Sequence, residues 1–227
     1  MIVKICGLMS PSDAVAVSEA GADWAGMVFH PRSKRCLDVG SASVVKEALD
    51  PGVASVAVIV DRDPSFVREL ADLGIIDMVQ VHANRDPVYL RAITDIGLPV
   101  IRAFVVSSRA DVEEAASCEA DHVMLDAGMG SGRRFDLSLV EDAGFDFILS
   151  GGLDPENVSE AITLSRPIGV DVSSGVETEG RKDPGKIREF VRRSKQALRR
   201  LASSSALPIL QRQCRDVGHL ISVSLPA

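Results

Sequence analysis

Eight short apolar runs recur along the chain, and most of them are followed by a stretch in which apolar and charged residues have helical spacing. This alternation constrains the fold most, because strands separated by helices form parallel sheets that the helices cover. Val, Ile, Leu and Ala abound, and only 4% of residues are aromatic, as expected for buried strands. The runs lie near residues 2–6, 24–29, 54–60, 77–81, 99–105, 122–126, 146–150 and 168–172.

The count of these runs distinguishes between two α/β architectures. Eight strands alternating with about eight helices in roughly 200 residues predict a (β/α)8 barrel, the parallel eight-stranded TIM barrel. The alternative is a doubly wound open sheet. The segment after the first run, Cys6-Gly7-Leu8-Met9-Ser10, lacks the GxGxxG pattern of dinucleotide-binding sheets, which favours the barrel.

Composition limits the classes of protein to consider. With 227 residues, 46% of them hydrophobic, the chain can bury the core of a single domain. A formal charge of −7 leaves no basic surface for nucleic acid or anionic lipid. No apolar stretch approaches the roughly 18 residues that cross a membrane, and no charged leader precedes the first strand. The four cysteines are too widely spaced for a disulfide framework or a zinc site, so we expect a cytoplasmic protein.

Capping residues followed by proline mark three expected helix starts, at Ser10-Pro11, Asp154-Pro155 and Asp183-Pro184. We assign residues 1–200 to the barrel. Three serines at 203–205 interrupt the apolar pattern, and residues 201–227 are expected to form a loosely ordered extension. The alternative is a docked helix near Pro208–Arg215.

Cys6 ends the first run, and parallel α/β proteins place their chemistry at the carboxyl ends of strands. Alternation puts Lys4 and Cys6 on one face of this strand, and Val3 and Ile5 on the face that helices cover. The charge of Lys4 could then help to hold Cys6 as the thiolate that accepts a proton. The alternative is that Cys6 is simply a small buried hydrophobe.

Asp126 ends the sixth run and precedes a glycine-rich segment at residues 127–132. A carboxyl group that closes a buried strand has either a satisfied charge or a raised pKa, and a raised pKa would suit a general acid. The alternative is an aspartate that only anchors the following loop. The glycine-rich segment could fold over a ligand or serve as a plain connection.

Small residues follow the last two runs, at Gly151-Gly152 and at Ser173-Ser174-Gly175. In TIM barrels, the loops after strands seven and eight, with a short extra helix, commonly bind phosphate. Glycines let backbone amides approach phosphate oxygens, and helix N-termini favour negative charge. We therefore predict a phosphate site here, with plain turns as the alternative.

Three further polar residues follow earlier runs. Arg35 could pair with a substrate carboxylate through its planar guanidinium, or lie in a solvated loop. Gln80 and His82 share one face of the fourth strand and could donate or accept hydrogen bonds, or be ordinary residues at the barrel rim. His30 and His122 are not spaced like metal ligands, so we expect no metal site.

These motifs, in order and over about residues 1–198, resemble those of the phosphoribosylanthranilate isomerases. The number of ordered motifs makes a chance match improbable. They are Val3-Lys4-Ile5-Cys6-Gly7, Ser33-Lys34-Arg35, Val79-Gln80-Val81-His82, Leu125-Asp126, Gly130-Ser131-Gly132, Leu149-Ser150-Gly151-Gly152-Leu153, Pro155-Glu156-Asn157-Val158, Asp171-Val172-Ser173-Ser174-Gly175-Val176-Glu177 and Gly180-Arg181-Lys182-Asp183.

The resemblance implies an Amadori rearrangement in tryptophan biosynthesis, without metal or organic cofactor, by a monomer or homodimer. The aspartate matching Asp126 is the family's general acid, which protonates the furanose ring oxygen, and the cysteine matching Cys6 is its general base, which removes the C2 proton. By the same carry-over, Arg35 would bind the anthranilate carboxylate and the two small-residue loops would bind phosphate. Asp171 would support the catalytic site from the eighth strand.

Other functions fit the sequence less well. A related histidine-pathway isomerase uses two aspartates and a duplicated phosphate motif, but Val60-Asp61-Arg62-Asp63-Pro64 stands after the third run instead of a Gly-Gly loop. A ribulose-phosphate epimerase would need metal-binding histidines and acids at several strand ends. A non-catalytic barrel that binds phosphate ligands remains as the alternative from another class. Cys6 and Asp126 both argue against it.

Overall fold

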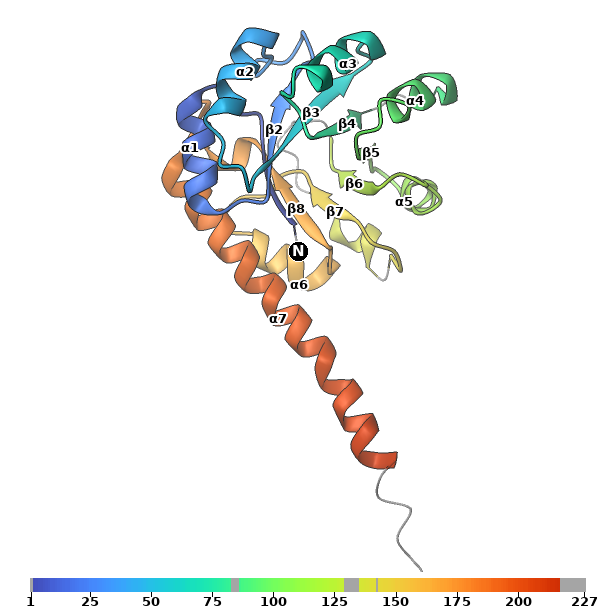
Figure 1. Ribbon diagram of the computed structural model, residues 1–227. Helices are drawn as coiled ribbons and strands as arrows, with labels where there is room; N and C mark the ends of the chain where they lie inside the picture. Colours follow the sequence, from blue (N-terminus) through green and yellow to red (C-terminus); the bar gives the residue numbers. More distant parts are fainter. Residues whose placement is uncertain (1, 83–85, 129–134, 142, 217–227) are drawn as a thin grey trace, which may run out of the picture.

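The computed structural model describes residues 2–82, 86–128, 135–141 and 143–216. Eight parallel strands form a closed barrel in which every strand pairs with its neighbours in sequence and β1 closes the ring by pairing with β8. The predicted TIM barrel is therefore confirmed, and Figure 1 shows its strands enclosed by helices. The strands are β1 (Ile2–Cys6), β2 (Trp24–Val28), β3 (Ala54–Val60), β4 (Met78–His82), β5 (Val100–Val105), β6 (His122–Asp126), β7 (Ile148–Ser150) and β8 (Gly169–Val172).

Helices cover the outside of the barrel between most of the strands. The connection from β6 to β7 differs from the expected alternation, because its described part contains only a short 3-10 helix, η1 (Leu137–Val140). A second 3-10 helix, η2 (Ser174–Val176), follows β8, and a small hairpin of β9 (Glu177–Thr178) and β10 (Arg181–Lys182) comes before the last helix. The α-helices are α1 (Pro11–Ala20), α2 (Val39–Glu47), α3 (Pro64–Asp72), α4 (Pro87–Thr94), α5 (Arg109–Ala116), α6 (Val158–Ser165) and α7 (Pro184–Asp216).

Two of the three predicted helix starts are correct. Ser10 caps α1 in a capping box with Asp13, and the Asp183 carboxylate accepts hydrogen bonds from the first backbone amides of α7. The prediction at Asp154-Pro155 is wrong, because α6 begins at Val158. Asp154 and Asn157 instead exchange side-chain-to-backbone hydrogen bonds, which hold the segment between them as a turn.

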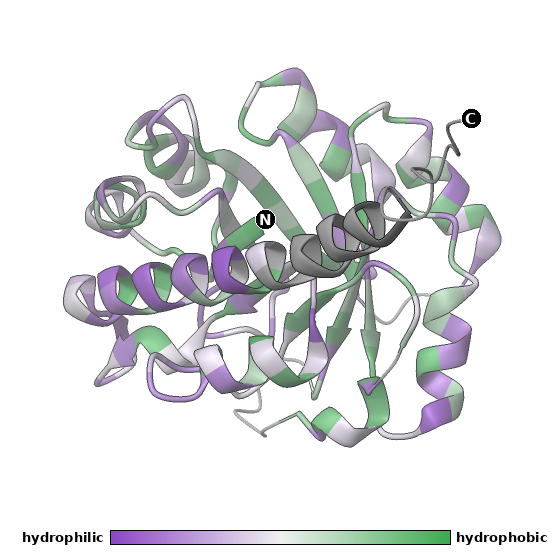
Figure 2. Cartoon of the chain, turned by 90° about the horizontal axis from the view of Figure 1, so that it is seen from below, coloured by the Kyte–Doolittle hydropathy of each residue, from purple (hydrophilic) through white to green (hydrophobic). Residues whose placement is uncertain are grey.

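The apolar side chains form two separate cores, because side chains alternate between the two faces of each strand. The larger core lies between the strands and the surrounding helices and includes Ile5, Leu125 and Val170. A smaller cluster fills the inside of the barrel. In Figure 2 the strands are largely hydrophobic, whereas the helices around them alternate between hydrophobic and hydrophilic residues.

Helix α7 begins against the barrel and continues past it. Ile187, Phe190 and Val191 are buried, and the helix packs beside α1 and α6. It runs through the three serines at 203–205 without a break, and its distal part projects away from the barrel in Figure 1. Residues 217–227 of the predicted extension lie outside the described residues. The loose order of the extension therefore stays a prediction.

Candidate active site

A cavity of about 620 Å³ opens at the carboxyl ends of the strands, within the range of roughly 300–1,000 Å³ typical of small-molecule sites. Every site residue predicted from the sequence lines it. They are Cys6, Arg35, Gln80, His82, Asp126, Gly151, Gly152, Asp171, Ser173, Ser174 and Gly175.

Cys6 lies above a buried ion pair. Lys4 is fully buried, and its Nζ donates a hydrogen bond of 2.7 Å to Asp171 Oδ1. The two residues are direct partners in the register of β1 and β8, so alternation turns both side chains into the barrel. Ser150, at the end of β7, donates to the other carboxylate oxygen of Asp171 at 3.0 Å.

Gly26 makes room for the thiol and the ammonium group. It is the register partner of Cys6 on β2, and a Cβ added there would lie 2.9 Å from Cys6 Sγ and 3.1 Å from Lys4 Nζ. Any larger residue would displace one of the two groups. The sequence motifs gave no hint of this role, because Gly26 lies in the middle of a strand.

Burial raises the pKa of Cys6, whereas the nearby positive charge of Lys4 lowers it. Lys4 thus acts in the direction expected from the sequence, but the net direction is upward, because Lys4 limits the effect of burial without reversing it. Burial also lowers the pKa of Lys4, but Asp171 and Cys6 outweigh it and the pKa of Lys4 is raised. Lys4 is therefore a permanent buried cation beside the thiol.

Asp126 ends β6 at the same cavity and is buried. Its Oδ1 accepts a hydrogen bond of 3.2 Å from the backbone N–H of Gly128. Gly151, beyond its register partner Ser150, approaches it closely: a Cβ on Gly151 would lie 2.5 Å from the Ala127 backbone nitrogen and 3.0 Å from Asp126 Oδ1. Residues 129–134 of the glycine-rich segment lie outside the described residues.

The loops after β7 and β8 pack directly against each other. A Cβ on Gly175 would overlap the carbonyl oxygen of Leu153, so only glycine allows this contact. The loops thus bring Gly151-Gly152 and Ser173-Ser174-Gly175 to one side of the cavity. The short helix expected beside the phosphate site corresponds to η2, which begins at Ser174.

Gln80 and His82 form a buried pair on β4. Gln80 Nε2 lies 2.5 Å from His82 Nε2, and burial, followed by the charge of Lys4, lowers the pKa of His82 to about 4. The imidazole is therefore neutral near pH 7. With Nε2 accepting from the amide, its proton lies on Nδ1. Within the described part of the chain, His82 Nδ1 and Gln80 Oε1 have no hydrogen-bond partner, so one donor and one acceptor remain for a ligand.

Arg35 is buried, which excludes the solvated-loop alternative. Its Nε and Nη2 donate to the two carboxylate oxygens of Glu177 at 2.6 and 2.9 Å. Lys182 donates to the same carboxylate at 2.9 Å. The sequence analysis assigned no role to Glu177 or Lys182, because both lie on the small hairpin after β8 rather than at the end of a barrel strand.

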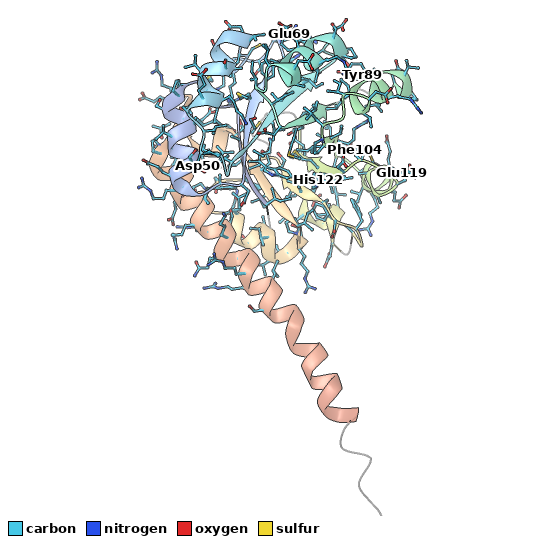
Figure 3. All side chains as sticks on the ribbon, in the orientation of Figure 1. Asp50, Glu69, Tyr89, Phe104, Glu119 and His122 are labelled. Carbon is cyan, nitrogen blue, oxygen red and sulfur yellow. The ribbon has the colours of Figure 1, made fainter. Side chains whose placement is uncertain are left out.

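Two further histidines lie in the described part of the chain: His30 lines the cavity, whereas His122 does not. His122, which Figure 3 labels, lies at the start of β6. Its ring is tilted by 60° against that of Trp24 at the start of β2, with the ring centroids 5.0 Å apart. Among the described residues, no group of three or more His, Cys, Asp or Glu side chains is arranged to hold a metal ion. No helix in the described part of the chain is long and apolar enough to cross a membrane.

Comparisons with known proteins agree on one family. The family model for N-(5'-phosphoribosyl)anthranilate isomerase matches residues 3–193. The isomerase of Lacticaseibacillus casei strain BL23 is 38% identical over 196 residues, which are 86% of this chain and 96% of that protein. The isomerase of Thermotoga maritima is 39% identical over 201 residues, 85% of this chain and 98% of its own length.

Solved structures of the same family share the fold. A phosphoribosylanthranilate isomerase in complex with reduced 1-(o-carboxyphenylamino)-1-deoxyribulose 5-phosphate matches with a TM-score of 0.77 and 37% identity, over 86% of this chain and all of that one. The Thermotoga maritima crystal structure matches with a TM-score of 0.78 and 38% identity, over 86% of this chain and 100% of that one. The chain therefore belongs to the N-(5'-phosphoribosyl)anthranilate isomerase family and is an isomerase.

Proposed function

We propose that this protein converts N-(5-phosphoribosyl)anthranilate to 1-(2-carboxyphenylamino)-1-deoxyribulose 5-phosphate, an Amadori rearrangement in tryptophan biosynthesis. The observation that carries the proposal is that Cys6 and Asp126 line one cavity together with two small-residue loops and a buried arginine. A thiol and a carboxyl group are the acid–base pair that this reaction needs. The proposal takes its substrate from the named activity of the relatives.

In the first step, Asp126 acts as the general acid. Its carboxyl proton passes to the ring oxygen of the furanose while the bond from C1 to that oxygen breaks. The nitrogen lone pair forms the C1–N double bond, which gives an open-chain protonated Schiff base. The position of Asp126 supports this role, because its carboxyl group ends β6 at the cavity that also contains Cys6.

In the second step, the Cys6 thiolate removes the proton from C2. The electrons of that bond form a C1–C2 double bond and neutralise the nitrogen, which gives an enolamine, and tautomerisation of the enolamine gives the ketone. The Lys4–Asp171 ion pair lies below the thiol, and Lys4 stabilises the negative charge on sulfur. Only the thiolate accepts a proton, and the charge of Lys4 favours this form against the effect of burial.

The rest of the cavity binds the substrate at three places. The loops at Gly151-Gly152 and Ser173-Ser174-Gly175 hold the phosphate through backbone amides. The Nδ1–H of His82 and the Oε1 of Gln80, which have no partner among the described residues, bind a sugar hydroxyl that can satisfy both. Arg35 binds the anthranilate carboxylate.

The loss of phosphoribosylanthranilate fluorescence on addition of purified protein tests the proposal. Freshly prepared substrate should lose its fluorescence at a rate proportional to enzyme concentration, with the carboxyphenylamino-deoxyribulose phosphate as the product. A folded protein that leaves the fluorescence unchanged would contradict the proposal. Binding of the substrate without turnover would instead favour a non-catalytic barrel that binds phosphate ligands.

A further inference from the structure

The Arg35 guanidinium is held by a carboxylate before any substrate arrives. Its Nε–Nη2 edge makes a two-point contact with Glu177, with hydrogen bonds of 2.6 and 2.9 Å. The side chains of Arg35 and Glu177 are only 10% and 5% exposed. Such a fork-to-fork pair fixes the plane of the guanidinium. Its other edge, formed by Nη1 and Nη2, is directed away from Glu177.

Lys182 completes the cluster and is the more deeply buried of its two cations. Its side chain is 1% exposed, and its Nζ donates to Glu177 Oε1 at 2.9 Å. Lys34, 3.7 Å from Glu177 and 64% exposed, adds little because water screens it. One buried carboxylate thus faces two buried cations, Arg35 and Lys182, and this leaves a net charge of about +1. An incoming carboxylate would balance that charge.

Glu177 remains ionised across the whole physiological range. Burial raises the pKa of Glu177, but hydrogen bonds from Arg35 and Lys182 outweigh burial and bring the pKa to about 2. The pair with Arg35 therefore does not depend on pH near neutrality.

The cluster also joins three parts of the cavity wall. Lys182 Nζ donates to the backbone carbonyl of Ser173 at 2.8 Å, and Ser173 Oγ donates to the carbonyl of Cys6 at 3.0 Å. The stem of Arg35 lies so close to Gly7 that a Cβ there would overlap its Cδ. Glu177 and Lys182 thus connect the arginine to the backbone beside Cys6 and to the predicted phosphate loop.

We propose that Glu177 and Lys182 are positioning residues for substrate recognition. Glu177 orients the free edge of Arg35 towards the carboxylate on the aromatic ring, and Lys182 fixes Glu177 against the loop at Ser173. This inference rests on the proposed function, in which Arg35 binds that carboxylate. Through Arg35, Glu177 and Lys182 together make the enzyme selective for an aromatic amine that carries a carboxylate.

Calorimetric titration with two inert ligands tests this role. One is reduced 1-(o-carboxyphenylamino)-1-deoxyribulose 5-phosphate, and the other is the same compound without the ring carboxylate. Glu177→Gln should weaken binding of the first by roughly tenfold, the scale of immobilising one long side chain, and leave the second within about twofold. Lys182→Met should also weaken binding of the first ligand only, and by a smaller factor than Glu177→Gln does.

Glu189→Gln is the matched control. Glu189 also pairs with two cations, Arg192 and Arg193, but none of these three residues lines the cavity. Its substitution should change neither affinity. Unfolding curves for each variant confirm that the protein is folded. If Glu177→Gln does not fold, Glu177→Gln/Lys182→Met, which keeps the net charge of the cluster, should show the same selective loss.

Two results would overturn the inference. Equal weakening of both ligands by Glu177→Gln would mean that the ion pair only supports the fold. Tighter binding of the carboxylated ligand would mean that Glu177 acts through its negative charge alone, because its removal strengthens the local field for an anion. Turnover of the wild-type protein is measured in the same preparation. Absence of turnover therefore identifies a failure of the proposed function, separately from either result.

Discussion

The two ends of the barrel interior are built by the same strands and yet have opposite chemistry. At the amino-terminal end, apolar side chains such as Val56, Ile101 and Met124 pack together. At the carboxyl-terminal end, the inward positions carry polar residues, among them Cys6 and Asp126. On β6, Met124 and Asp126 are two positions apart, with only Leu125 between them. The boundary between structural support and chemistry thus falls within single strands.

The polar side chains at the carboxyl-terminal end are buried away from water, so they need hydrogen-bond and ion-pair partners within the protein. A buried charge is costly unless it is paired, and Lys4 meets this requirement through Asp171, which Ser150 also contacts. The apolar end needs only close packing. Substitutions at the two ends should therefore separate loss of activity from loss of stability.

The largest expected effect comes from removing the acid or the base. Cys6→Ala and Asp126→Asn should each lower kcat by at least about a hundredfold, the scale of general acid–base catalysis. Steady-state kinetics with the fluorescent substrate measures this. The urea midpoint of each variant should stay near that of the wild type. Near-wild-type turnover of either variant would refute its assigned role.

The opposite result is expected two residues earlier on β6. Met124 is fully buried in the apolar cluster, and Met124→Ala should lower the free energy of unfolding by about 2–5 kcal/mol through lost contacts and a cavity. Its kcat should stay within a few-fold of wild type below the unfolding transition. Urea denaturation measures the free energy of unfolding, and steady-state kinetics on the same preparation measures kcat. A Met124→Ala enzyme that is stable but inactive would show that the two ends are not separate.

The smallest expected effect concerns the ionisation of Cys6. Lys4→Met removes the positive charge that opposes the effect of burial, so the pKa of Cys6 should rise further and its thiolate should form at higher pH. Asp171→Asn removes a negative charge and should shift the pKa of Cys6 the other way. The pH dependence of Cys6 alkylation, followed by peptide mass mapping, measures both shifts.

The double variant Lys4→Met/Asp171→Asn serves as the control for that experiment. It removes the buried charges as a pair and should show a smaller shift than Lys4→Met, because the two opposite effects on the pKa of Cys6 are lost together. The other charge acting on Cys6, that of Lys182, is unchanged throughout. If the pKa of Cys6 shifted in the same direction in both single variants, packing and not charge would control that pKa.

Much of the site was predictable because it follows strand order. Cys6, Asp126 and Asp171 end strands or lie near their ends, and the barrel brings all such ends to one mouth. The start of α6 was not predicted correctly, because Asp154 and Asn157 satisfy each other in a turn before the helix begins. Local capping signals do not reveal which of two alternative hydrogen-bond partners a side chain takes.

The sequence by itself determined the barrel, since eight alternating units with apolar strands leave few other ways to bury their surface. It also determined which reactive residues stand at the strand ends. Only the tertiary structure decided that Glu177 and Lys182 reach back to Arg35, 142 residues from Glu177 in the chain. The physical reason is that periodicity records which face of an element is buried, whereas a pairing between distant segments depends on how the closed barrel brings their loops together.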